Sequence, residues 1–198
     1  MGEKIIQPPF YNSGFYNTGA GGGGGNFVEI KGVFYEYVKI GSLFWTTRNL
    51  LYIPNSITLN PGSMLNTACA WTKAVNDLEV YYNGYVPSIL LNEDLNGFRL
   101  PSASDFENLK SAASPNSCTR LKSLTTWNTG TSTNEFGFNA KATGYIDNSL
   151  NLINENGTTD YWTSDNNISY WFGANINDIV QENSGKDQAF SIRLCKDA

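Results

Sequence analysis

The stretch Val28–Leu50, VEIKGVFYEYVKIGSLFWTTRNL, decides the expected fold. It is rich in β-branched and aromatic residues, which pack well on a pleated surface and favour strands. The pair Lys31-Gly32 separates the short run Phe27–Ile30 from the longer run Val33–Ile40. Two such runs joined by a short glycine-containing connection are typical of a hairpin. We therefore predict an antiparallel hairpin near the beginning of the folded part of the chain.

Three further segments follow downstream: GFRLPSASDFENL at Gly97–Leu109, YWTS at Tyr161–Ser164 and FSIRLCKD at Phe190–Asp197. In this order, and together with Val28–Leu50, they resemble the Fibrobacter succinogenes major paralogous domain family, whose C-type-lectin-like fold is related to that of formylglycine-generating enzymes. The resemblance covers about residues 27 to 198. It implies an α+β domain with two helices and short antiparallel sheets joined by long loops, in which the first and last strands pair. It also implies a binding module more than an enzyme.

Two helices are expected before Pro115. The second is the better specified, because Pro101 ends a strand-like segment and Ser102 with Asp105, or Ser104 with Glu107, can form a capping box. Its core-facing residues would be Phe106, Leu109 and Ala113. The first would begin at Asn66 or Thr67 and carry an apolar stripe at helical spacing, made of Ala70, Trp71, Ala74, Val75 and Leu78.

Beyond Pro115 the chain consists of short apolar and aromatic segments broken by glycine and asparagine, which predicts strands joined by polar loops. In the last of them Phe190, Ile192 and Leu194 alternate with polar residues or cysteine, as a half-buried strand requires. The predicted strands are Leu121–Trp127, Phe136–Tyr145, Tyr161–Ser164, Tyr170–Ala174 and Ala189–Cys195.

The first residues differ from the rest of the chain. Residues 1–20 contain F-Y-N-[ST]-G twice, and residues 21–26 begin with five glycines. Such a glycine run has no side chains to pack and predicts a flexible linker. The four aromatic rings ahead of it would be costly to leave in water, so we predict an extended anchor peptide that docks on another protein; the alternative is an ordinary disordered terminus. The anchoring residues would be Phe10, Tyr11, Phe15 and Tyr16.

Composition narrows the classes of function. The net charge is −5 and the Lys and Arg residues are scattered, so nucleic acid is not an expected partner. Histidine is absent, which removes the commonest general base and metal ligand, and we expect no catalytic residues, no metal and no cofactor. No apolar run is long enough for a membrane span or a signal peptide, so neither membrane insertion nor ordinary export is expected.

Three cysteines, Cys69, Cys118 and Cys195, are far apart and odd in number. One disulfide is an option, but free thiols are the default expectation. The family resemblance would give Cys195 a partner in a Cys-Pro pair, and this chain has Asp94-Leu95-Asn96 at that place. The loss of that disulfide fits assembly in a reducing compartment.

A candidate ligand-binding surface is predicted from tryptophans that lie near asparagine and aspartate in the sequence, because a flat ring next to polar side chains can bind a neutral sugar. Trp45, Trp71 and Trp162 are predicted to pack in the core, which leaves two less constrained rings. If a ligand surface exists, it would lie where their loops converge. The candidate residues are Trp127, Asn128, Asp165, Asn166, Tyr170 and Trp171.

A lectin-like domain with an aromatic anchor and no export signal is expected to be a bacteriophage virion fibre or decoration protein. The anchor would dock on other virion proteins of the capsid or tail, and the domain would touch a host-surface glycan or protein weakly, in many copies. A dimer or trimer is expected from virion symmetry. One alternative is a bacterial cell-surface adhesin or envelope protein; another is an enzyme, either of the formylglycine-generating kind or glycan-active, using loop carboxylates such as Asp147, Glu155, Asp160 and Asp165.

Overall fold

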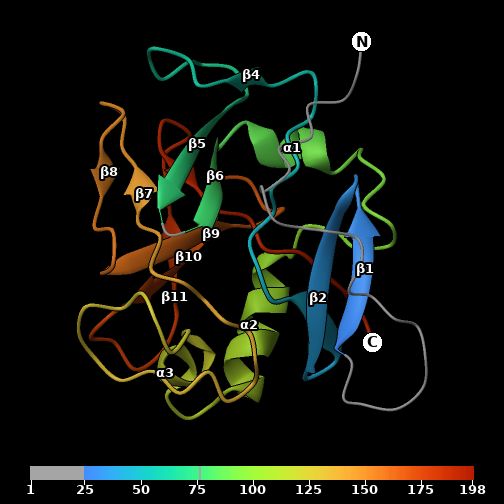
Figure 1. Cartoon of the computed structure of the whole chain (residues 1–198), viewed down its shortest axis with the longest axis vertical. Coiled ribbons are helices and arrows are strands. Elements are labelled where there is room, and N and C mark those ends of the chain that lie inside the picture. The colour runs from blue at the N-terminus through green and yellow to red at the C-terminus, as the bar shows by residue number, and fades with distance from the viewer. Residues whose placement is uncertain (1–24, 76) are drawn as a thin grey trace.

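The computed structural model describes residues 25–75 and 77–198 and has a mixed α+β fold, mostly of strands, with three short helices (Figure 1). Its strands form three sheets, with the orders β1-β2-β3-β13, β11-β10-β9 and β4-β5-β6-β12-β7-β8. The anchor residues Phe10, Tyr11, Phe15 and Tyr16 lie outside the described residues, as do Gly21–Gly24 of the linker. The strands are β1 Asn26–Ile30, β2 Val33–Ile40, β3 Leu43–Thr46, β4 Thr58–Leu59, β5 Cys69–Val75, β6 Asp77–Asn83, β7 Tyr145–Ile146, β8 Leu152–Ile153, β9 Thr158–Trp162, β10 Ile168–Gly173, β11 Val180–Asn183, β12 Ala189–Phe190 and β13 Cys195–Asp197; the helices are α1 Val86–Leu90, α2 Ala103–Ala112 and α3 Ser117–Leu121.

The predicted hairpin is confirmed, because β1 and β2 pair antiparallel from Asn26↔Tyr37 to Ile30↔Val33. Lys31 and Gly32 connect them with φ values of 50° and 78°. Positive φ at both central residues is the geometry of a two-residue turn whose twist matches the strands. The last strand joins the same sheet, but it pairs with β3, through Cys195↔Trp45, and not with the first strand.

Helix α2 is the helix predicted after Pro101, and its capping box is the one formed by Ser102 and Asp105. The Ser102 hydroxyl accepts the backbone N–H of Asp105 at 3.1 Å, and the Asp105 carboxylate accepts the backbone N–H of Ser102 at 2.7 Å. Phe106, Leu109 and Ala113 are buried as predicted. Two donors that the helix would otherwise leave unpaired are thereby satisfied.

The helix predicted from Asn66 or Thr67 is wrong, because the chain there forms β5 and β6, which pair antiparallel along their length. Trp71 lies opposite Tyr81 in this pair. The apolar spacing that suggests a helix stops at Leu78, where a run of aromatic and β-branched residues favours a strand and supplies a partner for the preceding segment. The short helices α1 and α3, each of 5 residues, were not predicted.

The predicted strands around Tyr161 and Tyr170 correspond to β9 and β10, and the last predicted strand is split into β12 and β13. The predictions for Leu121–Trp127 and most of Phe136–Tyr145 are wrong: Leu121 ends α3, and only Tyr145 belongs to a strand, β7. Left-handed backbone interrupts both segments, with φ of 80° at Thr126 and 59° at Asn139. A strand cannot continue through residues in that conformation.

Helix α2 packs between the sheet that contains β3 and the sheet that contains β10. The ring of Phe106 lies 5.3 Å from that of Trp45 and stacks on that of Tyr170 at 4.6 Å between centroids. Trp45, Trp71 and Trp162 are all buried, as predicted. The three cysteines are also buried and free, in agreement with the expected thiols.

Candidate functional site

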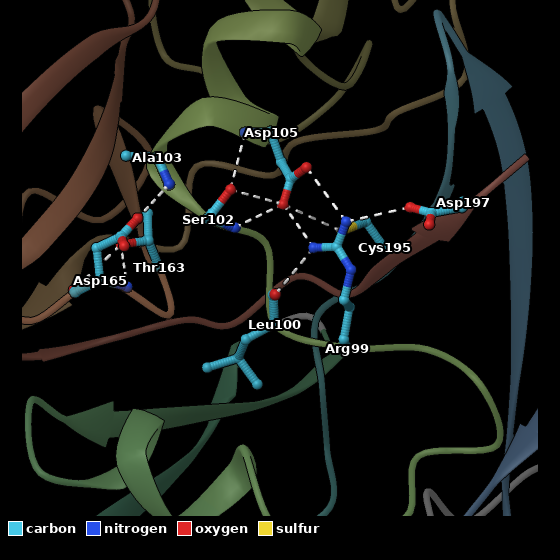
Figure 2. A network of polar contacts seen from close by, with 9 residues as sticks. All are labelled: Arg99, Leu100, Ser102, Ala103, Asp105, Thr163, Asp165, Cys195 and Asp197. Atoms are coloured by element: carbon cyan, nitrogen blue, oxygen red, sulfur yellow. Dashed lines mark hydrogen bonds and ion pairs between the residues drawn. The ribbon is translucent and has the colours of Figure 1, made fainter.

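The segment Arg99–Ser102, part of the stretch Gly97–Leu109 quoted above, forms a polar network (Figure 2). The Arg99 guanidinium binds both oxygens of Asp105 and reaches Asp197 of the last strand at 3.3 Å. The Arg99 and Cys195 backbones bond to each other in both directions, at 2.8 and 3.0 Å. The network therefore joins the beginning of α2 to the end of the chain.

The charges in this network stabilise the helix start. Burial opposes ionisation of Asp105, but hydrogen bonds from Arg99 and Ser102 lower its pKa below the ordinary value. A carboxylate in the first turn also interacts favourably with the helix dipole. This agrees with the expectation that the motif ends a strand and caps a helix.

Cys195 lies beside this network but is placed as a core residue. Its sulfur is 4.0 Å from the Asp105 carboxylate, and burial raises the pKa of its thiol to about 12. Burial likewise raises the pKa of Cys118 to about 11. A reactive cysteine needs a thiolate near neutral pH and access to solvent, and neither thiol has them.

Asp165 and Asn166, two of the predicted ligand residues, are exposed in the loop before β10. The Asp165 carboxylate accepts the backbone N–H of Ala103, the first residue of α2, at 2.6 Å (Figure 2). Asp165 thus serves as a second cap of α2 from a distant segment. Asn167, which follows, has a φ of 61°, as expected for a turn former.

Trp127 is half-buried and held by its own domain. Its indole N–H donates to the carbonyl of Ala140 at 3.0 Å, and the Lys122 ammonium lies 4.9 Å from the ring centroid. The side chain of Asn128 is exposed, while its backbone N–H donates to the carbonyl of Asn156 at 2.8 Å. One face and the polar edge of this indole are therefore already occupied.

Tyr170 cannot belong to a ligand surface, because it is fully buried. Its ring stacks on Phe106, and its hydroxyl lies within hydrogen-bond distance of Ala103, Glu107 and Gln181. Residues in a strand alternate between faces, so Trp171 points to the opposite side of the sheet from Tyr170. The expectation that both rings share one surface is corrected accordingly.

The predicted loops also do not converge. Asp165 and Asn166 precede β10, whereas the Trp127–Gly130 loop lies at the other end of that strand, where a Cβ on Gly130 would overlap the Ala174 carbonyl. A strand of 6 residues is about 20 Å long. The six candidate residues therefore divide into two groups at opposite ends of β10, a buried Tyr170, and Trp171 between them.

Trp171 lies on the face of the sheet β11-β10-β9 that also carries Thr158, Asp160, Gly173 and Val180, which we call the outer face; Trp162 and Ser169 share this face at its other end, where it is buried. These residues share one face, because Trp171 pairs with Asp160 and Val180 while Gly173 pairs with Thr158. Ring atoms of Trp171 lie 2.6 to 3.2 Å from the position that a Gly173 Cβ would take. Only glycine there allows the indole to lie against the strand. Val180 beside it is 40% exposed.

Asp160 on this outer face was predicted to lie in a loop and instead lies inside β9, 3% exposed. Burial, with a smaller contribution from the charge of Glu182, raises its pKa well above the ordinary value. The run Thr158–Trp162 has the composition of a strand, and this is the signal by which the sequence could have placed Asp160 there.

Replacing Asp160 with asparagine should change how stability depends on pH. The folded state holds the carboxyl proton more tightly than the unfolded chain, whose pKa is about 3.9. The wild-type protein therefore loses stability as pH rises above that value, up to the raised folded-state pKa. We expect Asp160→Asn to gain stability relative to wild type when urea unfolding is compared between about pH 4 and 8.

Asp147→Asn is the matched control. Backbone hydrogen bonds from Asn151 and Ser149 lower the pKa of Asp147, so this carboxylate stabilises the fold once it is ionised. Its replacement should show the opposite trend and lose stability relative to wild type as pH rises. An Asp160→Asn difference that stays constant across the same range would contradict the assignment.

Comparison of the chain with protein-family models, with curated proteins and with solved structures finds no match. Within residues 25–75 and 77–198, no helix is long and apolar enough to cross a membrane. In the same part of the chain, no group of three or more Cys, Asp or Glu side chains is placed to hold a metal ion.

Proposed function

We propose that this chain is a non-enzymatic bacteriophage virion protein, a fibre or decoration protein that displays a C-type-lectin-like domain for weak binding to a host-surface glycan or protein. The observation that carries the binding role is the outer face of β11-β10-β9. There the half-buried Trp171 and the partly exposed Val180 lie on the same face as the Thr158 hydroxyl, which has no hydrogen-bond partner among the described residues, and the buried Asp160 carboxyl group. An aromatic ring beside polar groups is a common composition of ligand sites.

The lectin-like fold is supported by the motif segments in their structural context. Arg99–Ser102 ends an extended segment and starts α2, and the terminal segment at Cys195 returns to the sheet of β1 and β2. The first arrangement is what the family resemblance implies for this motif; in the second, the terminal segment joins the sheet of the first strand but pairs there with β3.

A non-enzymatic role is supported by how the reactive groups are placed. The thiols of Cys118 and Cys195 are buried with raised pKa, and the chain has no histidine to activate a nucleophile. Asp165 is used to cap α2. Asp165 and Asp147, two of the loop carboxylates, thus accept backbone hydrogen bonds that stabilise local structure.

The anchor is part of the same proposal. Residues 1–20 would dock their four aromatic rings on a capsid or tail protein, and the glycines would let the domain project outward. Many weak contacts would then act together, since linking raises the effective concentration of each domain. Closed symmetry of the attachment site would give a dimer or trimer.

Deleting residues 2–20 tests the anchoring role. The deleted chain should fold with the same thermal unfolding curve as the full chain and fail to appear in purified particles. A full-length variant in which Phe10, Tyr11, Phe15 and Tyr16 are all serine separates the rings from the length of the peptide and should also be absent from particles. Incorporation of either variant at the wild-type level would refute the anchoring role, and recovery of the full chain in a cell envelope instead would support the adhesin alternative.

A further inference from the structure

Three buried side-chain atoms lack a hydrogen-bond partner among the described residues: Trp45 Nε1, Arg193 Nε and Thr158 Oγ1. Trp45 and Arg193 are at most 1% exposed and lie in the interior. Thr158 is 9% exposed, is the first residue of β9 and lies on the outer face. An unpaired buried hydroxyl costs free energy, so a group that it can bond to would be stabilised there.

Thr158 lies next to the indole of Trp171. It pairs with Gly173, and the indole occupies the space above Gly173. Side chains directly opposite each other on antiparallel strands have their Cβ atoms about 5 Å apart, so the ring edge and the hydroxyl are neighbours. Rotation of Thr158 about χ1 moves its hydroxyl from the buried position to another staggered position, from which it can reach a ligand.

Asp160 completes the group, because it lies directly opposite Trp171 on the same face. Within two residues of one strand, an unpaired hydroxyl and a buried carboxyl group therefore adjoin one aromatic ring that is partly open to solvent.

We propose that the outer face of β11-β10-β9 binds a neutral, hydroxyl-rich ligand, a saccharide, which stacks on Trp171 and hydrogen-bonds to Thr158 and Asp160. This inference rests on the proposed function, since it names the ligand class and the residues of the binding surface. A sugar ring offers C–H groups for the indole and hydroxyls at its edge that both donate and accept. Those are the interactions that a flat ring, a hydroxyl and a carboxyl group can satisfy together.

A cationic ligand is the competing class, because Asp160 and Glu182 are acidic and indoles bind cations. Recognition of a quaternary ammonium group uses a cage of several rings. On this face Trp171 is the aromatic ring next to Thr158 and Asp160. The ring of nearby Tyr145 packs edge-to-face against Phe190, with 5.8 Å between centroids. The arrangement is thus a single platform and not a cage, which favours the sugar.

The test uses the full chain on a broad glycan array, followed by saturation-transfer NMR titration with the saccharides that bind and with tetramethylammonium chloride as the cationic probe. Trp171→Ala should weaken saccharide binding about tenfold or more, and Trp171→Phe, which keeps a ring, should weaken it less. Thr158→Val, which replaces the hydroxyl with a methyl group, should weaken binding several-fold. Trp127→Ala, the other half-buried tryptophan, should bind as wild type does. Thermal unfolding of each variant identifies any loss caused by misfolding.

Saccharide binding that Trp171→Ala leaves intact would overturn this inference while the proposed function stands, because another surface would then carry the ligand. Trp171-dependent binding of tetramethylammonium without saccharide binding would overturn the ligand class. Absence of any Trp171-dependent binding would overturn the site itself. Whether the chain is incorporated into particles does not depend on any of these outcomes. The particle experiment therefore tests the proposed function separately from this inference.

Discussion

Arg193→Met is expected to lower the free energy of unfolding by about 3 kcal/mol or more, because each buried acceptor left without its donor costs about 1–3 kcal/mol. Arg193 is 1% exposed, and its guanidinium donates to the Thr46 carbonyl at 2.8 Å and to Asn49 Oδ1 at 2.9 Å. It also lies 4.5 Å from the ring of Phe138 and 5.3 Å from that of Tyr161. Methionine fills similar space but leaves these acceptors without a donor.

The loss would extend to Glu79, the buried carboxyl group of this network. Asn49 joins the two residues, because its amide donates to Glu79 at 2.9 Å while its carbonyl accepts from Arg193. Burial raises the pKa of Glu79, and the charge of Arg193 is among the effects that lower it. Without Arg193 the buried carboxylate is less compensated, so Glu79→Gln should recover part of the stability in the Arg193→Met background.

Arg99→Met provides the matched control, measured by the same urea unfolding experiment. The Arg99 side chain is 44% exposed; its ion pair with Asp197 is exposed, and its ion pair with Asp105 is open to solvent on the arginine side. Exposed pairs contribute up to about 1 kcal/mol. Equal losses for Arg99→Met and Arg193→Met would show that the buried network is not a main source of stability.

Local signals in the sequence predicted the local parts of this fold. Gly32, together with the strand-like runs on either side of Lys31-Gly32, predicts the turn of the β1–β2 hairpin, and in the structure φ is positive at both turn residues. Ser102 and Asp105 are three residues apart and cap α2 by contacts within one turn. In both places the residues that determine the structure are neighbours in the sequence.

Features that depend on distant residues were not predictable in the same way. Residues 69–75 form a strand because 77–83 pairs with them, and the apolar spacing of the first segment alone fits a helix. The last strand pairs with β3 through Cys195↔Trp45, which no local pattern specifies. Tertiary pairing overrides a weak local preference in both regions.

Of the residues that we propose for the ligand surface, Trp171 is among the sequence candidates for it, whereas Thr158 and Asp160 are not. Asn128, Asp165 and Asn166 follow tryptophans or turns in the sequence, but the length of β10 separates them in space. Thr158 and Asp160 are close to Trp171 only because β9 and β10 pair in a particular register. The register depends on the whole buried face of the sheet, and a sequence window around Trp171 does not contain it.

Trp162→Ala is expected to lower the free energy of unfolding by about 3–5 kcal/mol, as for other large-to-small changes at buried aromatic residues. Trp162 is 1% exposed, its ring centroid lies 4.5 Å from that of Phe190, and its indole N–H donates to the Tyr82 carbonyl at 2.6 Å. Alanine would leave a cavity between β9 and β12 and an unpaired buried carbonyl. Urea unfolding measures the loss, and Trp162→Phe, which keeps a ring but not the donor, should lie between alanine and wild type.

Trp171→Ala is the counterpart that separates packing from binding. Trp162 and Trp171 lie on the same face of the sheet, Trp162 at its buried end, but Trp171 is only half-buried, so its removal should cost about 1 kcal/mol of stability. Its effect should appear in saccharide binding instead. If the two alanine variants lose equal stability, the outer face is a packing surface that happens to be exposed. If Trp171→Ala stays folded and no longer binds saccharide, Thr158 and Asp160 beside it are the polar residues of a binding site.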